Sequence, residues 1–164
     1  MLATALAVIL GVRHPALSGD FGSRVEDTLE VMTSAFTLEG AERKTSRHTA
    51  RVVGRAGAGN DVQYDVLSQI ELPPGQYQLR LAVQSAAMNK TGSIYATVEV
   101  PDFRREALAL SGIVLSASPA PLAAPEGPLA PLLPVAPTTE RVFTPNSTVS
   151  AFSRIYQGRT TPEA

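Results

Sequence analysis

The two histidines, His14 and His48, have the widest chemical range in this sequence, because an imidazole acts as acid, base or metal ligand near neutral pH. The chain has no cysteine, which excludes thiolate nucleophiles, disulfides and cysteine-bound metals. A zinc site would therefore need both histidines together with carboxylates. The two lie far apart in the sequence, without the short spacing of a local metal motif. We expect no metal and no cofactor, and interpret both as ordinary surface or strand residues.

Sequence motifs that carry catalysis or ion binding are also missing. The chain contains no Gly-x-Ser-x-Gly, His-Glu-x-x-His, Asp-x-Ser-x-Ser or EF-hand pattern. The glycine-rich run at residues 54–60 has the composition of a phosphate-binding loop, but such a loop must lead into a helix. Residues 61–66, which follow it, alternate as in a strand. We predict a connection between strands there and a protein that is not an enzyme.

The charge of the chain argues against nucleic acid as a partner. The chain has 14 Lys and Arg against 15 Asp and Glu, a net charge of −1, and so no overall field that attracts polyanions. Basic residues gather in the segment Arg43–Val53. We interpret this segment as an edge strand, whose charges discourage pairing with another sheet. A polyanion-binding patch is the alternative, but no aromatic residues are interleaved there to stack bases.

Strands must position all of these residues, and the clearest strand pattern is at residues 76–85. Apolar side chains alternate there with polar ones, at Tyr77, Leu79, Leu81 and Val83. This period of two is typical of a strand with one buried face. A second sheet must therefore cover that face.

The turn Pro73-Pro74-Gly75 stands directly before this strand. Proline cannot donate to a strand ladder and glycine tolerates positive φ, so the turn ends one strand and starts the next. Tyr77 follows it like the tyrosine of a tyrosine corner, whose hydroxyl bonds to the backbone a few residues upstream. We predict structural, non-catalytic roles for Pro73, Pro74, Gly75 and Tyr77.

Six further segments have strand patterns, at residues 1–12, 27–37, 43–53, 62–72, 93–100 and 107–118. Seven short strands separated by turn signals, with no convincing helix, predict an all-β domain over residues 1–118. The expected architecture is an antiparallel β-sandwich of the immunoglobulin or fibronectin type III kind. Because the chain has neither tryptophan nor a cysteine pair, the fibronectin-like form is favoured. A barrel is the main alternative.

The first of these segments is almost wholly apolar and therefore resembles a targeting sequence. However, no Lys or Arg precedes it, and Arg13-His14-Pro15 is not a small-residue cleavage site. It is also too short to cross a bilayer as a helix. Its large side chains, such as Leu6 and Val8, share one parity, and the small ones share the other. We predict a strand with two unequally packed faces, and no membrane span.

The composition changes at Pro119. The last five of seven prolines, from Pro125 to Pro137, are spaced by three residues, which is the period of polyproline II. We predict a proline-rich linker over residues 119–138, or alternatively a docking site for an aromatic-lined proline-binding domain. Residues 139–164 return to strand patterns and predict the incomplete N-terminal hairpin of a second β domain, because two strands cannot bury a core alone.

Three segments carry a resemblance to a known family: Leu72–Val83, Lys90–Phe103 and Leu108–Leu115, supported by Val8–Arg13, Leu133–Pro137 and Ala151–Gly158. They resemble the region C-terminal to the A domain of bacterial VWFA-related exported proteins. The resemblance implies an extracytoplasmic location, secreted or at the cell surface. It also implies neighbouring domains in a longer chain, including a von Willebrand factor A-type domain. That A domain would carry any metal-dependent adhesion site, so no functional residue is implied here.

The function that follows is a non-catalytic β-sandwich spacer or protein-interaction module of an exported bacterial protein, with a possible protein partner. A carbohydrate- or small-ligand-binding sandwich is the first alternative, which an exposed row of aromatic residues would favour. Aromatic residues are only 5% of the chain, so few are available for such a row. An enzyme fragment with an unrecognised site is the third.

Overall fold

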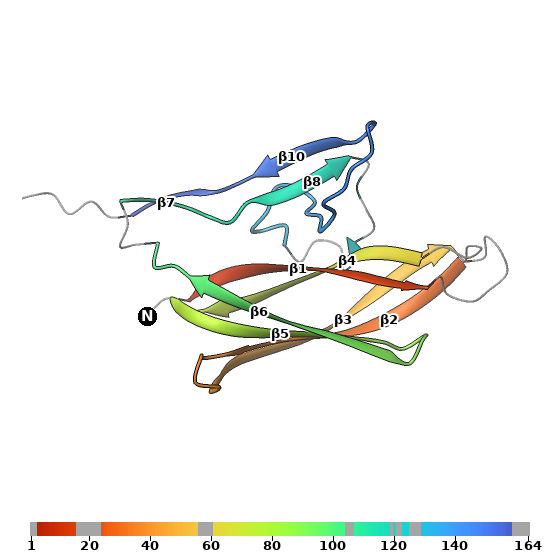
Figure 1. The fold of residues 1–164 in the computed structure, drawn as a ribbon, viewed down its shortest axis with the longest axis horizontal. Helices are drawn as coiled ribbons and strands as arrows, with labels where there is room; N and C mark the ends of the chain where they lie inside the picture. Colours follow the sequence, from red (N-terminus) through yellow and green to blue (C-terminus); the bar gives the residue numbers. More distant parts are fainter. Residues whose placement is uncertain are drawn as a thin grey trace, which may run out of the picture.

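β-strands form the architecture of the described residues in the computed structural model, which are 3–15, 24–55, 61–103, 107–118, 120, 123–124 and 129–158. No helix occurs among them, so the part of the chain that is described offers no helical candidate for crossing a membrane. The predicted all-β class with antiparallel sheets is confirmed (Figure 1). The strands are β1 (Thr4–Pro15), β2 (Arg24–Phe36), β3 (Glu42–Arg55), β4 (Asp61–Leu72), β5 (Gly75–Ser85), β6 (Lys90–Val100), β7 (Leu108–Leu110), β8 (Val114–Ser118), β9 (Ala123–Ala124), β10 (Thr148–Phe152) and β11 (Ile155–Gln157).

Two sheets face each other across the core (Figure 1). One has the order β3-β2-β5-β6 and is antiparallel throughout. The other pairs β1 with β4 antiparallel and adds β9 to β4 as a short parallel contact. β1 to β6 cover the six strands predicted within residues 1–100, with ends that differ by a few residues.

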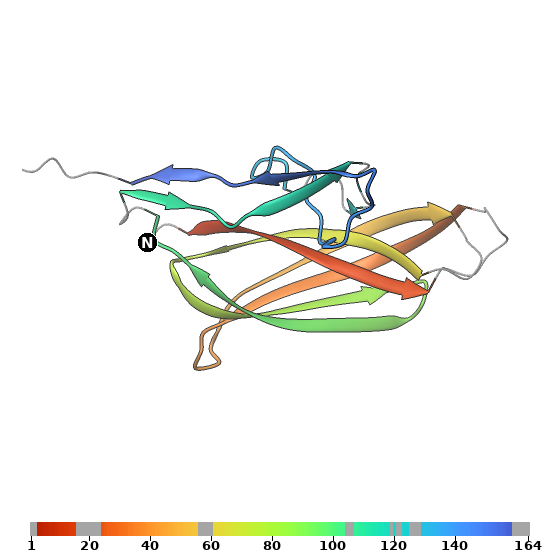
Figure 2. The ribbon, with the colours of Figure 1, turned by 45° about the horizontal axis from the view of Figure 1, so that its top comes forward.

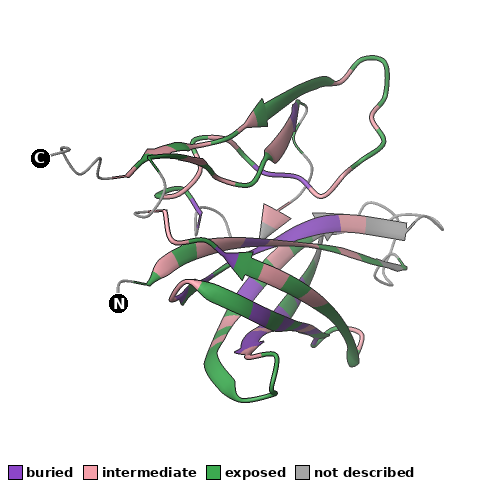
Figure 3. Ribbon diagram, turned by 60° about the vertical axis from the view of Figure 1, so that its left-hand side comes forward, coloured by how far each residue is buried: buried purple, intermediate pink, exposed green. Residues whose placement is uncertain are grey.

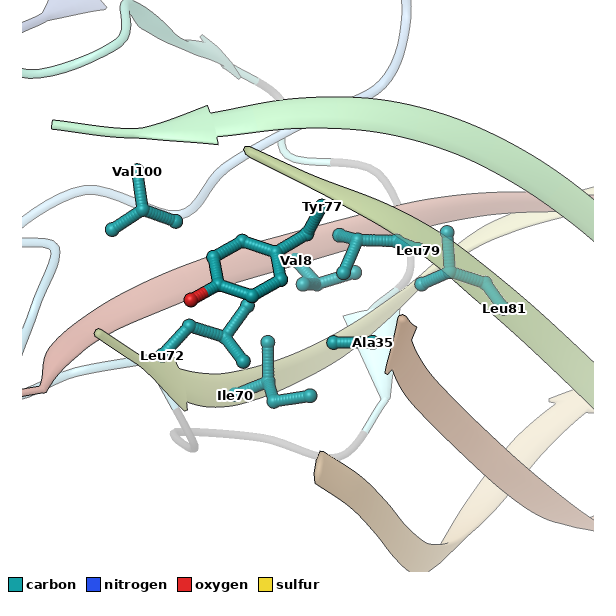
Figure 4. Close-up of a cluster of buried hydrophobic side chains, with 8 residues drawn as sticks. All are labelled: Val8, Ala35, Ile70, Leu72, Tyr77, Leu79, Leu81 and Val100. Atoms are coloured by element: carbon teal, nitrogen blue, oxygen red, sulfur yellow. The ribbon is translucent and has the colours of Figure 1, made fainter. Parts of the chain in front are cut away.

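The core lies between the facing sheets, where the apolar side of each period-two strand points inward. One cluster joins β1, β2, β4, β5 and β6 (Figure 4) and consists of Val8, Ala35, Ile70, Leu72, Tyr77, Leu79, Leu81 and Val100. A second cluster consists of Leu29, Val31, Ala50, Tyr64, Val66 and Val83. The apolar face predicted for residues 76–85 is therefore the buried face of β5.

A third layer lies against the outer face of the β1–β4 sheet (Figures 1 and 2). This outer layer is formed by β7, β8, β10 and β11 together with residues 129–147. β8 pairs with β10, and β7 with β11, both antiparallel. The two ladders join where the Ser111 amide donates to the Arg154 carbonyl at 2.8 Å and the Arg154 amide donates to Ser111 Oγ at 2.9 Å.

The strand pairing within the outer layer differs from the hairpin expected for residues 139–164. β10 and β11 do not pair with each other; they pair with β8 and β7, which lie in the segment assigned to the first sandwich. That segment, 107–118, is one predicted strand but forms two, interrupted at residues 111–113. Gly112 lies in the interruption, and a Cβ there would meet no atom within 4 Å, so no neighbouring backbone requires a glycine at this position.

The described part of the proline-rich segment also differs from a straight polyproline II helix, which has no internal hydrogen bonds. The amides of Leu132 and Leu133 both donate to the Leu129 carbonyl at 2.8 Å and close a turn. Leu129 is buried, and the Thr138 amide donates to the Leu115 carbonyl at 2.9 Å. The segment therefore folds into a turn and bonds to β8 here. Pro119, Pro121, Pro125 and Pro128, residues 56–60 of the glycine-rich run and residues 159–164 lie outside the described residues.

Asp65 anchors the outer layer to β4. Its carboxylate accepts hydrogen bonds from the Thr139 amide, at 3.2 and 3.3 Å, and from the Thr139 hydroxyl. Gly11 is the register partner of Asp65 on β1, and a Cβ at Gly11 would collide with the Thr139 side chain. Asp65 lies on the outer face of β4, yet it is only 1% exposed. The outer layer covers that face, so the middle of β4 is buried (Figure 3).

Candidate functional site

The two edges of the four-stranded sheet differ in charge. β3 carries ion pairs from its basic residues to carboxylates on β2 and β4: Arg47 to Glu30 at 3.1 Å, Lys44 to Glu71 at 3.3 Å, and Arg51 to Glu26. These pairs are solvent-exposed, so each stabilises the fold by only ~0–1 kcal/mol. Their charges do oppose the addition of another strand at this edge. β3 is thus the edge strand expected from residues 43–53, and no strand among the described residues pairs with its far side in this sheet.

The opposite edge, β6, lacks this protection. From Lys90 to Tyr95 every residue of β6 is exposed, including Ile94 at 50% and Tyr95 at 57%. Ile94 pairs across the ladder with buried Leu81, so it lies on the inward face. Tyr95 lies on the outward face, where the Arg80 guanidinium is 5.7 Å from its ring centre. β6 therefore presents apolar side chains to its surroundings, together with a backbone edge that no other described strand pairs with.

A groove lies between this edge and β1, the edge of the facing sheet, at the end where β1 finishes and β6 begins. It forms a cavity of about 400 Å³. Its apolar lining comes from both sheets and from the β5–β6 turn: Leu10, Val12, Leu29, Tyr64, Leu81, Val83, Met88 and Ile94. Gly92 pairs with Val83, and a Cβ at Gly92 would meet nothing within 4 Å. The absent side chain leaves the cavity open.

A buried carboxylate holds the turn that borders this cavity. Asp27 accepts hydrogen bonds from Ser85 Oγ at 2.5 Å and from the Ala87 amide at 2.9 Å. Ser85 Oγ in turn accepts from the Met88 amide at 3.1 Å. Asn89 takes a positive φ of 50°, a conformation that asparagine tolerates better than most residues. The position of Met88 at the mouth of the cavity is thereby set.

Tyr64 forms part of the cavity floor, and its environment raises the pKa of its hydroxyl to about 12, mainly through burial and secondly through the charge of Asp27. A folded-state pKa above the unfolded value favours the folded state below pH 10, and this contribution is lost as the pH rises from about 10 to 12. An ultraviolet titration of the four tyrosines should therefore contain a component with a midpoint near pH 12. The Tyr64→Phe variant should lack it, and its persistence would contradict the assignment.

The residues predicted to be structural lie at the other end of β5. The Tyr77 hydroxyl donates a hydrogen bond to the Pro73 carbonyl at 2.9 Å. Gly75 has a φ of 154°, and a Cβ there would approach the Tyr77 hydroxyl to 3.3 Å. Pro73 and Pro74 are half-buried beside this contact. The geometry is that of a tyrosine corner, and its contribution to stability stays a prediction.

Replacing Tyr77 with phenylalanine tests that contribution. The variant keeps the ring, which is packed in the core, and removes only the bond to Pro73. We expect the free energy of unfolding to fall by ~1 kcal/mol, measured from urea denaturation midpoints. Tyr95→Phe is the matched control, because Tyr95 is exposed. Equal midpoints for Tyr77→Phe and the unmodified chain would remove the stabilising role.

The two histidines lie in different sheets, His14 on β1 and His48 on β3. Burial lowers the pKa of His48, partly offset by a hydrogen bond to the Leu67 backbone. The His14 side chain is outside the described residues. Within the described ranges, no group of three or more His, Asp or Glu residues is placed to hold a metal ion.

The sequence analysis did not identify β6 as a candidate binding edge, nor Asp27 and Asp65 as buried carboxylates that hold a turn and the outer layer. The two aspartates had one available signal, since aspartate is depleted in strands and both occur within apolar strand patterns. No family model, curated protein or solved structure matches this chain.

Proposed function

We propose that the chain is a non-catalytic β-sandwich module, of the immunoglobulin or fibronectin type III kind, that binds another polypeptide at the β6 edge. The observation that carries this proposal is the contrast between the two edges of one sheet. β3 bears exposed ion pairs, whereas β6 bears exposed Ile94 and Tyr95 beside an apolar groove. An unprotected edge strand is a template for strand addition, a common mode of peptide recognition.

The outer layer supports a role between neighbouring domains of a longer chain, as a spacer does. Its surface exposes six large aliphatic side chains, and three of them lie on one face of the β7–β11 ladder: Leu108, Leu110 and Ile155. Exposed apolar residues grouped in this way mark contact surfaces. The exported location and the neighbouring von Willebrand factor A-type domain rest on the resemblance of residues 72–83, 90–103 and 108–115 to VWFA-related proteins.

A charged residue on the inward face of β6 tests the proposed edge binding. A displayed library of random 12-residue peptides, selected on the whole chain, should enrich segments with period-two apolar patterns. Ile94→Lys should weaken their binding at least tenfold, because an inward lysine opposes strand addition. Thr49→Lys, at an exposed position on β3, is the matched control and should not. Enriched peptides that bind Ile94→Lys as well as the unmodified chain would contradict the proposal.

A small-ligand-binding sandwich is the second candidate, because a cavity of about 540 Å³ lies between β1, the end of β6 and the outer layer. Aromatic residues line it: Phe103, Phe152 and Tyr156, with Phe103 and Tyr156 stacked at 4.2 Å between ring centres. Cavities of this size and apolar character hold small molecules in many proteins. Calorimetric titration with methyl laurate would test it, and the absence of heat at millimolar concentration would count against this function.

A further inference from the structure

The groove between β1 and β6 lies between two strand edges and could accept one further extended segment. β1 and β6 are the terminal strands of their sheets on the same side of the core, and they do not pair with each other. Their inward faces repeat every two residues, with Leu10 and Val12 on one wall and Gly92 and Ile94 on the other. An extended segment repeats its side chains with the same period. Its backbone would pair with an open edge, and its apolar side chains would enter the groove.

Lys90 is the charged residue that borders this groove on its inward side, since it has the same parity on β6 as Gly92 and Ile94. Arg13 also borders the groove, but its guanidinium lies on the outer face of the β1–β4 sheet, where it donates to the Gln63 amide oxygen at 2.8 Å. Lys90 takes part in none of the ion pairs formed among the described residues. The nearby carboxylate of Asp27 is buried and accepts from Ser85 and Ala87, so it is not presented to the groove.

We propose that the β1–β6 groove binds an extended polypeptide segment in which apolar residues alternate with polar ones and a carboxylate stands at the Lys90 end. This inference rests on the proposed function and adds the chemistry of the partner. The apolar lining of the cavity favours the alternating pattern, and charge complementarity with Lys90 favours a carboxylate at that end of the segment. The two open edges favour a polypeptide over a small anion, because the backbone of a polypeptide can pair with their N–H and C=O groups in place of water.

Two labelled peptides test the charge preference on the whole chain: Asp-Val-Thr-Val-Thr-Val-Asp and Lys-Val-Thr-Val-Thr-Val-Lys, with blocked termini. Each has the same residue at both ends, so either strand direction places that residue near Lys90. We expect the acidic peptide to bind about fivefold tighter at low ionic strength, the effect of one or two exposed charge pairs. Fluorescence anisotropy measures the affinities. Hydrogen exchange should show new protection at residues 90–100 and none at residues 42–55.

The Lys90→Glu variant should reverse the preference, and Lys44→Glu on β3 should leave it unchanged. If the two peptides bind equally, or if Lys90→Glu does not alter the preference, the proposed carboxylate at the Lys90 end is contradicted. Strand addition at β6 would still stand. If neither peptide binds, or one binds without protecting residues 90–100, both the inference and the proposed function fail.

Two other occupants of the groove would be detected by separate measurements: a second copy of the chain and a small amphipathic anion. Dimerisation in sedimentation velocity, abolished by Ile94→Lys, would assign the groove to a second copy of the chain and overturn the inference. Binding of dodecanoate at the groove, without binding of either peptide, would assign it to a small amphipathic anion and overturn it as well.

Discussion

Replacing Leu79 with alanine is expected to lower the free energy of unfolding by about 2–5 kcal/mol, the range for a large core side chain whose site collapses only partly. Leu79 is 3% exposed and lies in the cluster that joins both sheets, between Tyr77 and Leu81 on the inward face of β5 (Figure 4). Urea denaturation followed by circular dichroism measures the change. The chain contains no tryptophan, so a fluorescence signal would depend on its tyrosines.

The neighbouring residue provides the control for this prediction. Gln78 is on the same strand but on the exposed face, and Gln78→Ala should change the free energy of unfolding by less than about 0.5 kcal/mol. Because the two positions are adjacent, local strand propensity is nearly the same for both. Equal effects of the two substitutions would mean that the assignment of the β5 faces is wrong.

The strands of the sandwich could be predicted from the sequence because their pattern is local. On β5, the period-two alternation and the preceding Pro73-Pro74-Gly75 turn together identify the strand, its start and its buried face. The same holds for β2, where Leu29, Val31 and Ala35 are buried as their alternation indicates. A short strand that is half covered leaves this signal in its own residues, whatever lies beside it.

Sheet order and the outer layer could not be predicted, because they depend on residues far apart in the chain. A period of two shows which face of a strand is apolar but not which partner covers it. Residues 148–157 pair with residues 108–118 across the proline-rich segment, and no local pattern identifies that pairing. The small outward residues of β1 did indicate unequal faces, and Gly11 is where Thr139 of the outer layer fits.

The candidate binding edge could also be predicted only in part, because one of the two sheet edges has a local sequence signal and the other does not. β3 could be recognised as an edge because its charges lie in its own sequence. β6 has the alternation of an ordinary half-buried strand, at Ile94, Ala96, Val98 and Val100, and that pattern suits a central strand equally well. What makes it an open edge is the lack of a neighbour beyond it among the described strands.

Replacing Asp65 with alanine is expected to loosen the outer layer while the sandwich stays folded. The variant removes the acceptor of the Thr139 amide and hydroxyl bonds, and hydrogen bonds to a charged group stabilise by ~1.5–3 kcal/mol. Cleavage by thermolysin depends on the population of the open form, so residues 119–147 should be cut about tenfold faster or more. Mass spectrometry should show residues 61–103 intact after this first cut.

Glu71→Ala is the matched control, because Glu71 is an exposed carboxylate on the same strand and pairs with Lys44 instead of with the outer layer. It should leave the cleavage rate of residues 119–147 nearly unchanged.

The comparison of Asp65→Ala with Leu79→Ala also distinguishes two organisations of the chain. If the outer layer is a separate unit docked through Asp65, its loosening leaves the urea midpoint of the sandwich unaltered. If Asp65→Ala instead lowers that midpoint as Leu79→Ala does, or the first cut falls inside residues 62–100, the three layers unfold as one cooperative domain.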